Sequence, residues 1–169
     1  MRLLLAIVTL FLLSFVNTQA QQIPCDENTF TDAFLQEIEG DWSGVGQINK
    51  EVVRYSIHAN WALNHQFFHI SLKDISVPST YSAEIYIGFN CDSNNYVAHW
   101  IDSFGGAFSE TLGYGKATPN GILFKFQYPS GGFTNQFQLV KEHGWQMTTE
   151  AQNAQGEWFN FGNVVMKRN

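Results

Sequence analysis

The sequence has 169 residues, 15 acidic and nine basic side chains, and a formal net charge of −6. This acidic balance argues against nucleic acids and anionic membranes as partners, because both attract basic surfaces. The only adjacent basic residues are Lys167 and Arg168, and the length fits one ordinary domain.

Residues 1–20 have the pattern of a cleaved secretory signal peptide. Arg2 precedes an apolar run over 3–16, and Thr18-Gln19-Ala20 supplies small residues before the expected cleavage point. The alternative is a membrane anchor, but the run is shorter than the roughly 20 residues that a membrane-spanning helix needs. We therefore expect a secreted or periplasmic protein that has no membrane span.

Residues 21–39 are expected to form a lead and one short helix. Phe30, Phe34 and Ile38 recur every four residues over 28–40, Asn28 or Thr29 can cap the start, and Gly40 can follow the end. Cys25 and Cys91 are the two cysteines. In an exported chain they favour a disulfide, the alternative being two separate buried thiols.

Residues 40–169 are expected to form one β domain. Apolar and polar residues alternate with a period of two, and turn signals rich in Gly, Asn and Pro separate the segments. The pattern predicts an all-β fold. We expect an antiparallel up-and-down barrel of about ten strands, because closing the sheet removes its exposed edges. A β-sandwich is the alternative. The expected strands are 42–49, 51–61, 64–73, 81–90, 95–102, 108–117, 121–128, 133–141, 144–152 and 157–167.

Gly40-Asp41-Trp42, behind the expected helix, resembles the Gly-x-Trp signature of lipocalins and their calycin relatives. The longer Gly40-x-Trp42-x-Gly44-x-Gly46 string is similar to nitrobindin-type barrels and to a family of uncharacterised secreted lipocalin-like domains. In the latter family, the pattern Trp-x-Asp-Ser resembles residues 100–103 here. The resemblance implies that Trp42 closes the barrel floor and that Lys167 or Arg168 lies over its ring.

The residues offer no clear catalytic or metal-binding set. His65 and His69 are four apart on an expected strand, which is poor spacing for one zinc ion, and no Gly-x-Ser-x-Gly elbow occurs. Nitrobindin-type barrels hold haem through a His near the chain end, whereas this sequence has no His after His143. We therefore expect no metal, no haem and no other cofactor.

The aromatic content, 15 Phe, five Trp and six Tyr, is the main indication of function. Aromatic side chains with a few polar groups line small-molecule pockets, although they also fill barrel cores. The candidate ligand-binding residues are Tyr55, Phe68, Ile85, Ile87, His99, Trp100, Asp102, Phe124, Phe126 and Phe137.

The sequence thus predicts a monomeric binding protein that holds a small, mainly apolar molecule inside a barrel. One alternative is an enzyme of the isomerase or cyclase type that uses a pocket His or carboxylate. Another is an interaction module whose barrel is fully packed and binds no ligand.

Overall fold

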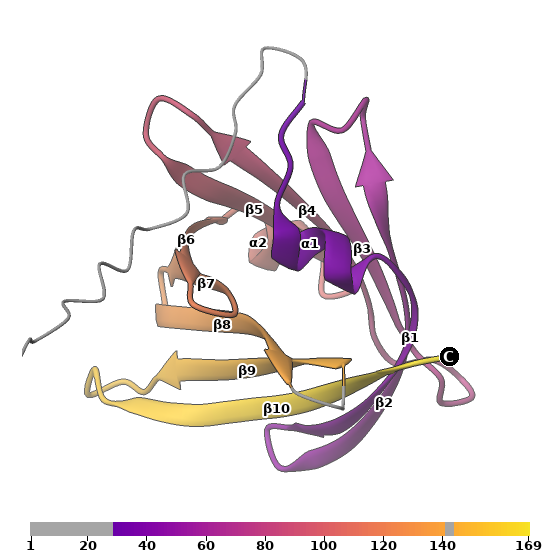
Figure 1. Cartoon of the computed structure of the whole chain (residues 1–169). Helices are drawn as coiled ribbons and strands as arrows, with labels where there is room; N and C mark the ends of the chain where they lie inside the picture. Colours follow the sequence, from indigo (N-terminus) through magenta and orange to yellow (C-terminus); the bar gives the residue numbers. More distant parts are fainter. Residues whose placement is uncertain (1–28, 141–143) are drawn as a thin grey trace, which may run out of the picture.

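The computed structural model describes residues 29–140 and 144–169, and ten antiparallel strands in this part of the chain form a closed barrel (Figure 1). Each strand pairs with its neighbours in sequence, and β1 also pairs with β10. The predicted all-β up-and-down barrel is therefore confirmed. The strands are β1 Gly40–Ile48, β2 Glu51–Ala62, β3 Phe67–Asp74, β4 Ser82–Asn90, β5 Asn95–Asp102, β6 Leu112–Thr118, β7 Gly121–Tyr128, β8 Gly131–Val140, β9 Gly144–Gln152 and β10 Trp158–Arg168.

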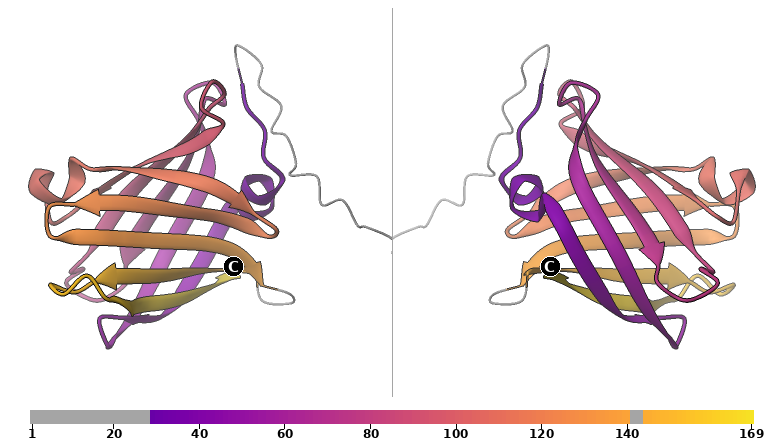
Figure 2. Two further views of the ribbon diagram at one scale, coloured as in Figure 1. Left: turned by 90° about the vertical axis from the view of Figure 1, so that its left-hand side faces the viewer. Right: turned by 90° about the vertical axis from the view of Figure 1, so that its right-hand side faces the viewer.

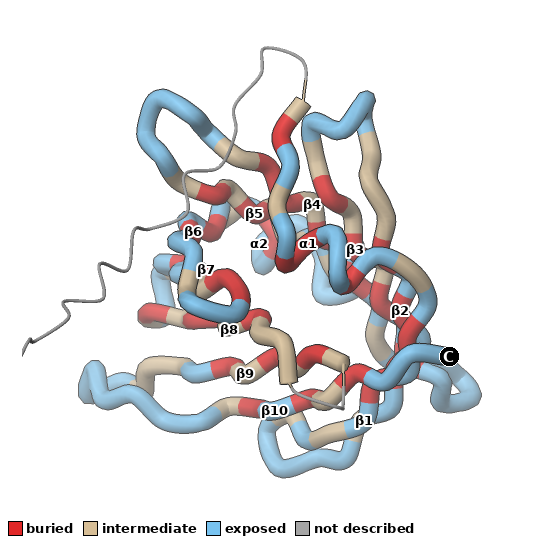
Figure 3. The backbone as a smooth tube through the Cα atoms, in the orientation of Figure 1, coloured by how far each residue is buried: buried red, intermediate tan, exposed pale blue. Residues whose placement is uncertain are grey.

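The barrel closes where β1 meets β10, from the pair Trp42 and Arg168 to the pair Ile48 and Gly162. Along most of each strand, more buried and less buried positions alternate, as the tube in Figure 3 shows. This alternation places the apolar set inside the barrel and the polar set in solvent.

The predicted helix is present but shorter, since α1 spans Ala33–Ile38. Its N-cap is Asp32, whose side chain accepts a hydrogen bond from the Leu35 amide at 2.8 Å. Thr29 is therefore not the cap, and Asn28 lies outside the described residues. Gly40 follows the C-cap Glu39 and has a φ of +123°, a conformation that favours glycine.

Two expected strands begin late, each for a local reason. The strand expected from residue 64 begins at Phe67, because Leu63, Asn64 and His65 have left-handed φ values of 49°, 56° and 60° and form a turn. The strand expected from residue 108 begins at Leu112, because a second helix, α2 (Gly106–Ser109), precedes it.

Helices α1 and α2 lie at opposite ends of the barrel (Figure 2). The end that carries α1 and the hairpins 63–66, 91–94 and 119–120 is called the helix end here. The other end, with α2 and the connections 49–50, 75–81, 103–111, 129–130 and 153–157, is called the mouth. Neither helix in the described ranges is long and apolar enough to cross a membrane.

Candidate functional site

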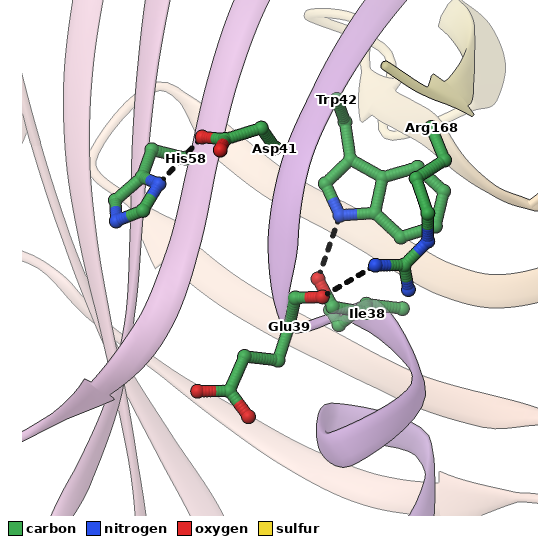
Figure 4. Close-up of polar contacts among 6 residues, drawn as sticks. All are labelled: Ile38, Glu39, Asp41, Trp42, His58 and Arg168. Carbon is green, nitrogen blue, oxygen red and sulfur yellow. Dashed lines mark hydrogen bonds and ion pairs between the residues drawn. The ribbon is translucent and has the colours of Figure 1, made fainter.

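Trp42 anchors the helix end (Figure 4). Its Nε1 donates to the Ile38 carbonyl at 2.8 Å, and the Arg168 Cζ lies 4.4 Å from the centroid of its ring. Arg168 also donates to the carbonyls of Glu39 and Glu37, at 3.1 and 3.0 Å. Of the two basic candidates, it is thus Arg168 that covers the indole, while Lys167 is exposed beside it on β10. All of these contacts are structural.

Aromatic rings fill the helix end of the barrel interior. Ring centroids 5.0–6.3 Å apart, mostly edge to face, form one continuous chain. Its members, in order, are Trp61, Phe30, Phe89, Tyr96, Phe124, Phe137, Trp145 and Trp42. Such contacts stabilise a core beyond the area that they bury, so this half has the character of packed interior.

Four of the candidate ligand-binding residues belong to this packed half. Phe124 and Phe137 are members of the ring chain, and Phe68 packs against Trp61 at 5.2 Å. Ile87 pairs in register with Phe68. Ile85 is buried between Ile70 and Trp100 on the neighbouring strands, which places it closer to the mouth.

The other inward candidates meet at the mouth, where a hydrogen-bonded group forms around Tyr81. The Trp100 Nε1 donates to the Tyr81 hydroxyl at 3.0 Å, and that hydroxyl donates to the Asp102 Oδ2 at 3.3 Å. The Asp102 Oδ1 accepts the Phe104 amide at 2.9 Å. The structure therefore brings Trp100 and Asp102 of the Trp-x-Asp-Ser segment to one phenol.

Burial changes the acidity of the mouth tyrosines. It raises the pKa of Tyr81 well above the ordinary range, and the negative charge of Asp102 adds to this rise. Burial, followed by the charge of Asp74, raises the pKa of Tyr55 to about 12. Burial and then the charge of Asp102 raise the pKa of Tyr128. These phenols are therefore neutral hydrogen-bonding groups at neutral pH.

Two series of ring contacts run through the mouth. The first joins Tyr55, Tyr81, Phe104 and Phe108, with centroids 6.2, 5.3 and 6.2 Å apart. It ends on rings that are exposed, because Phe104 and Phe108 keep 66% and 61% of their surface in solvent. The second series joins Phe126, Tyr128, Phe133 and Phe161. The mouth is thus lined by rings that reach from the interior to the surface.

Asp74 fixes the 75–81 connection beside this group. Its Oδ2 accepts the Thr80 hydroxyl at 2.6 Å, and its Oδ1 accepts the Ser76 amide and hydroxyl at 2.9 and 2.7 Å. The hydrogen bond from the Thr80 hydroxyl, followed by those from Ser76, lowers the pKa of Asp74 to about 2. Asp74 therefore holds the loop as a carboxylate.

Polar groups also occur on another part of the barrel wall, on β8 and β9. Asn135 is 3% exposed, and its Oδ1 accepts the Thr149 hydroxyl at 2.9 Å. Asn135 lies between Phe133 and Phe137 on the inward face of β8. It gives the interior wall an amide among rings.

His99, predicted for the pocket, lies on the outer face of β5. Successive residues of a strand point to opposite faces, so His99 cannot share the inward face of Trp100. Its Nε2 lies 2.8 Å from the Ser109 carbonyl, where it tethers α2 to β5. This placement corrects the prediction for His99.

The other described histidines lie outside the barrel interior. His58 pairs with Asp41 and His69 with Glu84, at 2.7 and 2.6 Å, and His65 stacks on Trp61 at the helix end. No three His, Cys, Asp or Glu side chains among residues 29–140 and 144–169 are grouped to hold a metal ion. Cys91 lies in the 91–94 hairpin and Cys25 outside the described residues, so their disulfide stays a prediction.

Sequence reasoning missed Tyr81, Tyr128 and Asn135 as members of the site. A signal for each was present, because each lies an even number of residues from a candidate on the same strand pattern: Tyr81 four from Ile85, Tyr128 two from Phe126 and Asn135 two from Phe137. The alternation could not predict the register of β4 and β5, which brings Trp100 and Asp102 close to Tyr81.

A protein-family model matches this chain. Its description is "Protein of unknown function (DUF1579)", and the match covers residues 29–168, all ten strands included. No curated protein matches the sequence.

Proposed function

Because the chain belongs to the DUF1579 family, whose description assigns no activity, we propose its function from the geometry of the barrel. The protein binds one small, mainly apolar molecule in the half of the barrel nearest the mouth. The apolar part of the molecule contacts the two series of aromatic rings described above, called the mouth rings, and a polar group of it contacts Asp102 and Tyr81. The observation that carries the proposal is the hydrogen-bonded group of Trp100, Tyr81 and Asp102 set among those rings.

The exposure of rings at the mouth supports this location. At the helix end, the contacting rings of Tyr96, Phe124, Phe137 and Trp145 are all buried. At the mouth, the ring series ends on the exposed Phe104 and Phe108. Apolar surfaces with a few convergent polar groups are typical of small-molecule sites.

We further infer that residues 1–20 are removed during export and that Cys25 then pairs with Cys91. The apolar run over 3–16 and the small residues at 18–20 support removal. An oxidising compartment supports the disulfide. Intact-mass measurement of the exported protein, before and after reduction, tests both inferences.

The binding proposal is tested by titrating the purified protein with the neutral fluorescent probe N-phenyl-1-naphthylamine. We expect saturable binding of one probe per chain and displacement of the probe by octan-1-ol. Tyr128→Trp adds bulk between the mouth rings and should weaken binding about tenfold, or about 1.4 kcal/mol. Tyr114→Trp, at a position that is 57% exposed, should leave binding unchanged. Absence of saturable binding, or equal binding by both variants, would overturn the proposal.

A further inference from the structure

The chemical class of the ligand follows from the charges at the mouth, and this inference rests on the proposed function. Asp102 is half-buried and lies on the inward face of β5, two residues after Trp100. Taking a carboxylate away from water is costly unless a positive charge or hydrogen bonds compensate it. The group that balances the negative charge of Asp102 therefore determines which class of ligand the site prefers.

No basic side chain compensates it among the described residues. The ion pairs in that part of the chain join His58 to Asp41 and His69 to Glu84, both on the outer face. The strand Lys and Arg residues alternate with the inward set and are exposed, and the guanidinium of Arg168 is held at the helix end. These exposed basic residues are Arg54, Lys73, Lys116, Lys125 and Lys167. Lys50, in the 49–50 connection at the mouth, is exposed as well and takes no part in these ion pairs.

The hydrogen bonds of Asp102 leave room for a ligand. Each carboxylate oxygen accepts one bond, from the Phe104 amide and from the Tyr81 hydroxyl, whereas a carboxylate offers about four acceptor positions. The bond from Trp100 to Tyr81 orients the phenol toward Asp102. The network thus stabilises the negative charge and does not neutralise it.

The rings around Asp102 match the same ligand chemistry. Tyr81 and Trp100 are in its hydrogen-bond network, and the Tyr81 ring packs against Phe104 at 5.3 Å. Both rings direct their polar edges, the Tyr81 hydroxyl and the Trp100 Nε1, into this network and so hold the carboxylate in place. A carboxylate among such rings is suited to an ammonium group and repels an anionic one.

We propose that the ligand is an apolar molecule that carries a cationic nitrogen, either a protonated aliphatic amine or a quaternary ammonium. The nitrogen lies against the Asp102 carboxylate beside Tyr81 and Trp100. The apolar part lies along the remaining mouth rings. A fatty acid is disfavoured, because Asp102 and Asp74 both repel its carboxylate and the described inward faces carry no basic partner at the mouth.

The test compares octylamine, octyltrimethylammonium, octan-1-ol and octanoate by isothermal titration calorimetry at neutral pH. These compounds share one chain and differ in the head group. We expect both cations to bind about tenfold or more tightly than the alcohol, and octanoate to bind most weakly. Asp102→Asn keeps the shape and removes the charge, so it should bring the cations to the affinity of the alcohol. Asp92→Asn, exposed in a hairpin at the helix end, is the matched control and should keep the preference.

Each outcome decides between the two proposals. If the wild-type protein binds the amine, alcohol and acid equally, the charge inference is overturned and apolar binding stands. If the preference survives in Asp102→Asn, the inference also fails. If none of the four compounds binds, both the proposed function and the charge inference fail. The wild-type comparison needs no variant, so it remains decisive if Asp102→Asn does not fold.

Discussion

Arg168 on the last strand lies over Trp42 on the first, with its Cζ 4.4 Å from the ring centroid. The same guanidinium donates to the carbonyls of Glu37 and Glu39, at the C-terminal end of α1. These carbonyls have no partner within a helix and attract positive charge. One side chain therefore joins both sides of the barrel seam to the helix that covers it.

Replacing Arg168 with alanine should destabilise the fold by about 2 kcal/mol, because it removes a cation–π contact and two charged hydrogen bonds. The free energy of unfolding in urea measures the loss. Lys167→Ala removes the adjacent exposed charge and should change stability by less than about 0.5 kcal/mol. Equal effects of the two substitutions would show that Arg168 has no special role in closing the barrel.

Gly113 on β6 makes room for a ring of β7. A Cβ at this position would lie 2.4 Å from the Cζ of Phe126. We therefore expect Gly113→Ala to cost about 1–3 kcal/mol, the usual cost of overpacking. Gly106→Ala in α2, where an added Cβ meets nothing within 4 Å, is the control and should not destabilise. If Gly113→Ala left the Tm in thermal unfolding unchanged, the Phe126 ring would be shown to move aside at little cost.

The Tyr81 hydroxyl is the shared partner of Trp100 and Asp102. Tyr81→Phe leaves the half-buried indole donor without that partner, which costs about 1–3 kcal/mol. Tyr114→Phe, at an exposed position on β6, should change neither the stability nor the tryptophan emission. Urea midpoints give the energies, and the change in tryptophan emission that is absent when Trp100 is replaced with Phe reports on Trp100. Tyr81→Phe with unchanged stability and emission would contradict the network.

Asp74 links stability to acidic pH. Its pKa in the folded protein is about 2, below the value of about 3.9 for an unfolded chain. Its contribution is therefore complete above about pH 4 and is lost as the pH falls toward 2. Asp74→Asn should lower the Tm at pH 6 and flatten the dependence of Tm on pH between 4 and 2. If the Tm of the variant fell between pH 4 and pH 2 as steeply as that of the wild type, groups other than Asp74 would control the loss of stability in acid.

Local patterns were sufficient to predict the barrel, because alternation with a period of two identifies a strand and the face that it buries. The inward candidates such as Tyr55 and Phe126 lie inside for this reason. His99 was misplaced because it was grouped with Trp100, its direct neighbour on the opposite face. Helix α2 has only four residues, including Gly106, so it leaves no helical period to detect.

The mouth site depends on information that does not lie in any one segment. Tyr81 meets Trp100 and Asp102 because Ala83 pairs with Asp102 across β4 and β5. Several registers would satisfy the alternation of each strand separately. The choice among them follows from the whole closed barrel.

The pairing of β1 with β10 also determines when the fold can be completed. Every other strand pair joins neighbours along the chain and can form as soon as its second strand is synthesised. The edge of β1 stays unpaired until Trp158–Arg168 has emerged. A nascent chain that stops before β10 keeps two open edges, and open edges recruit other chains. Truncated products of this protein should therefore aggregate, even though they contain nine of the ten strands.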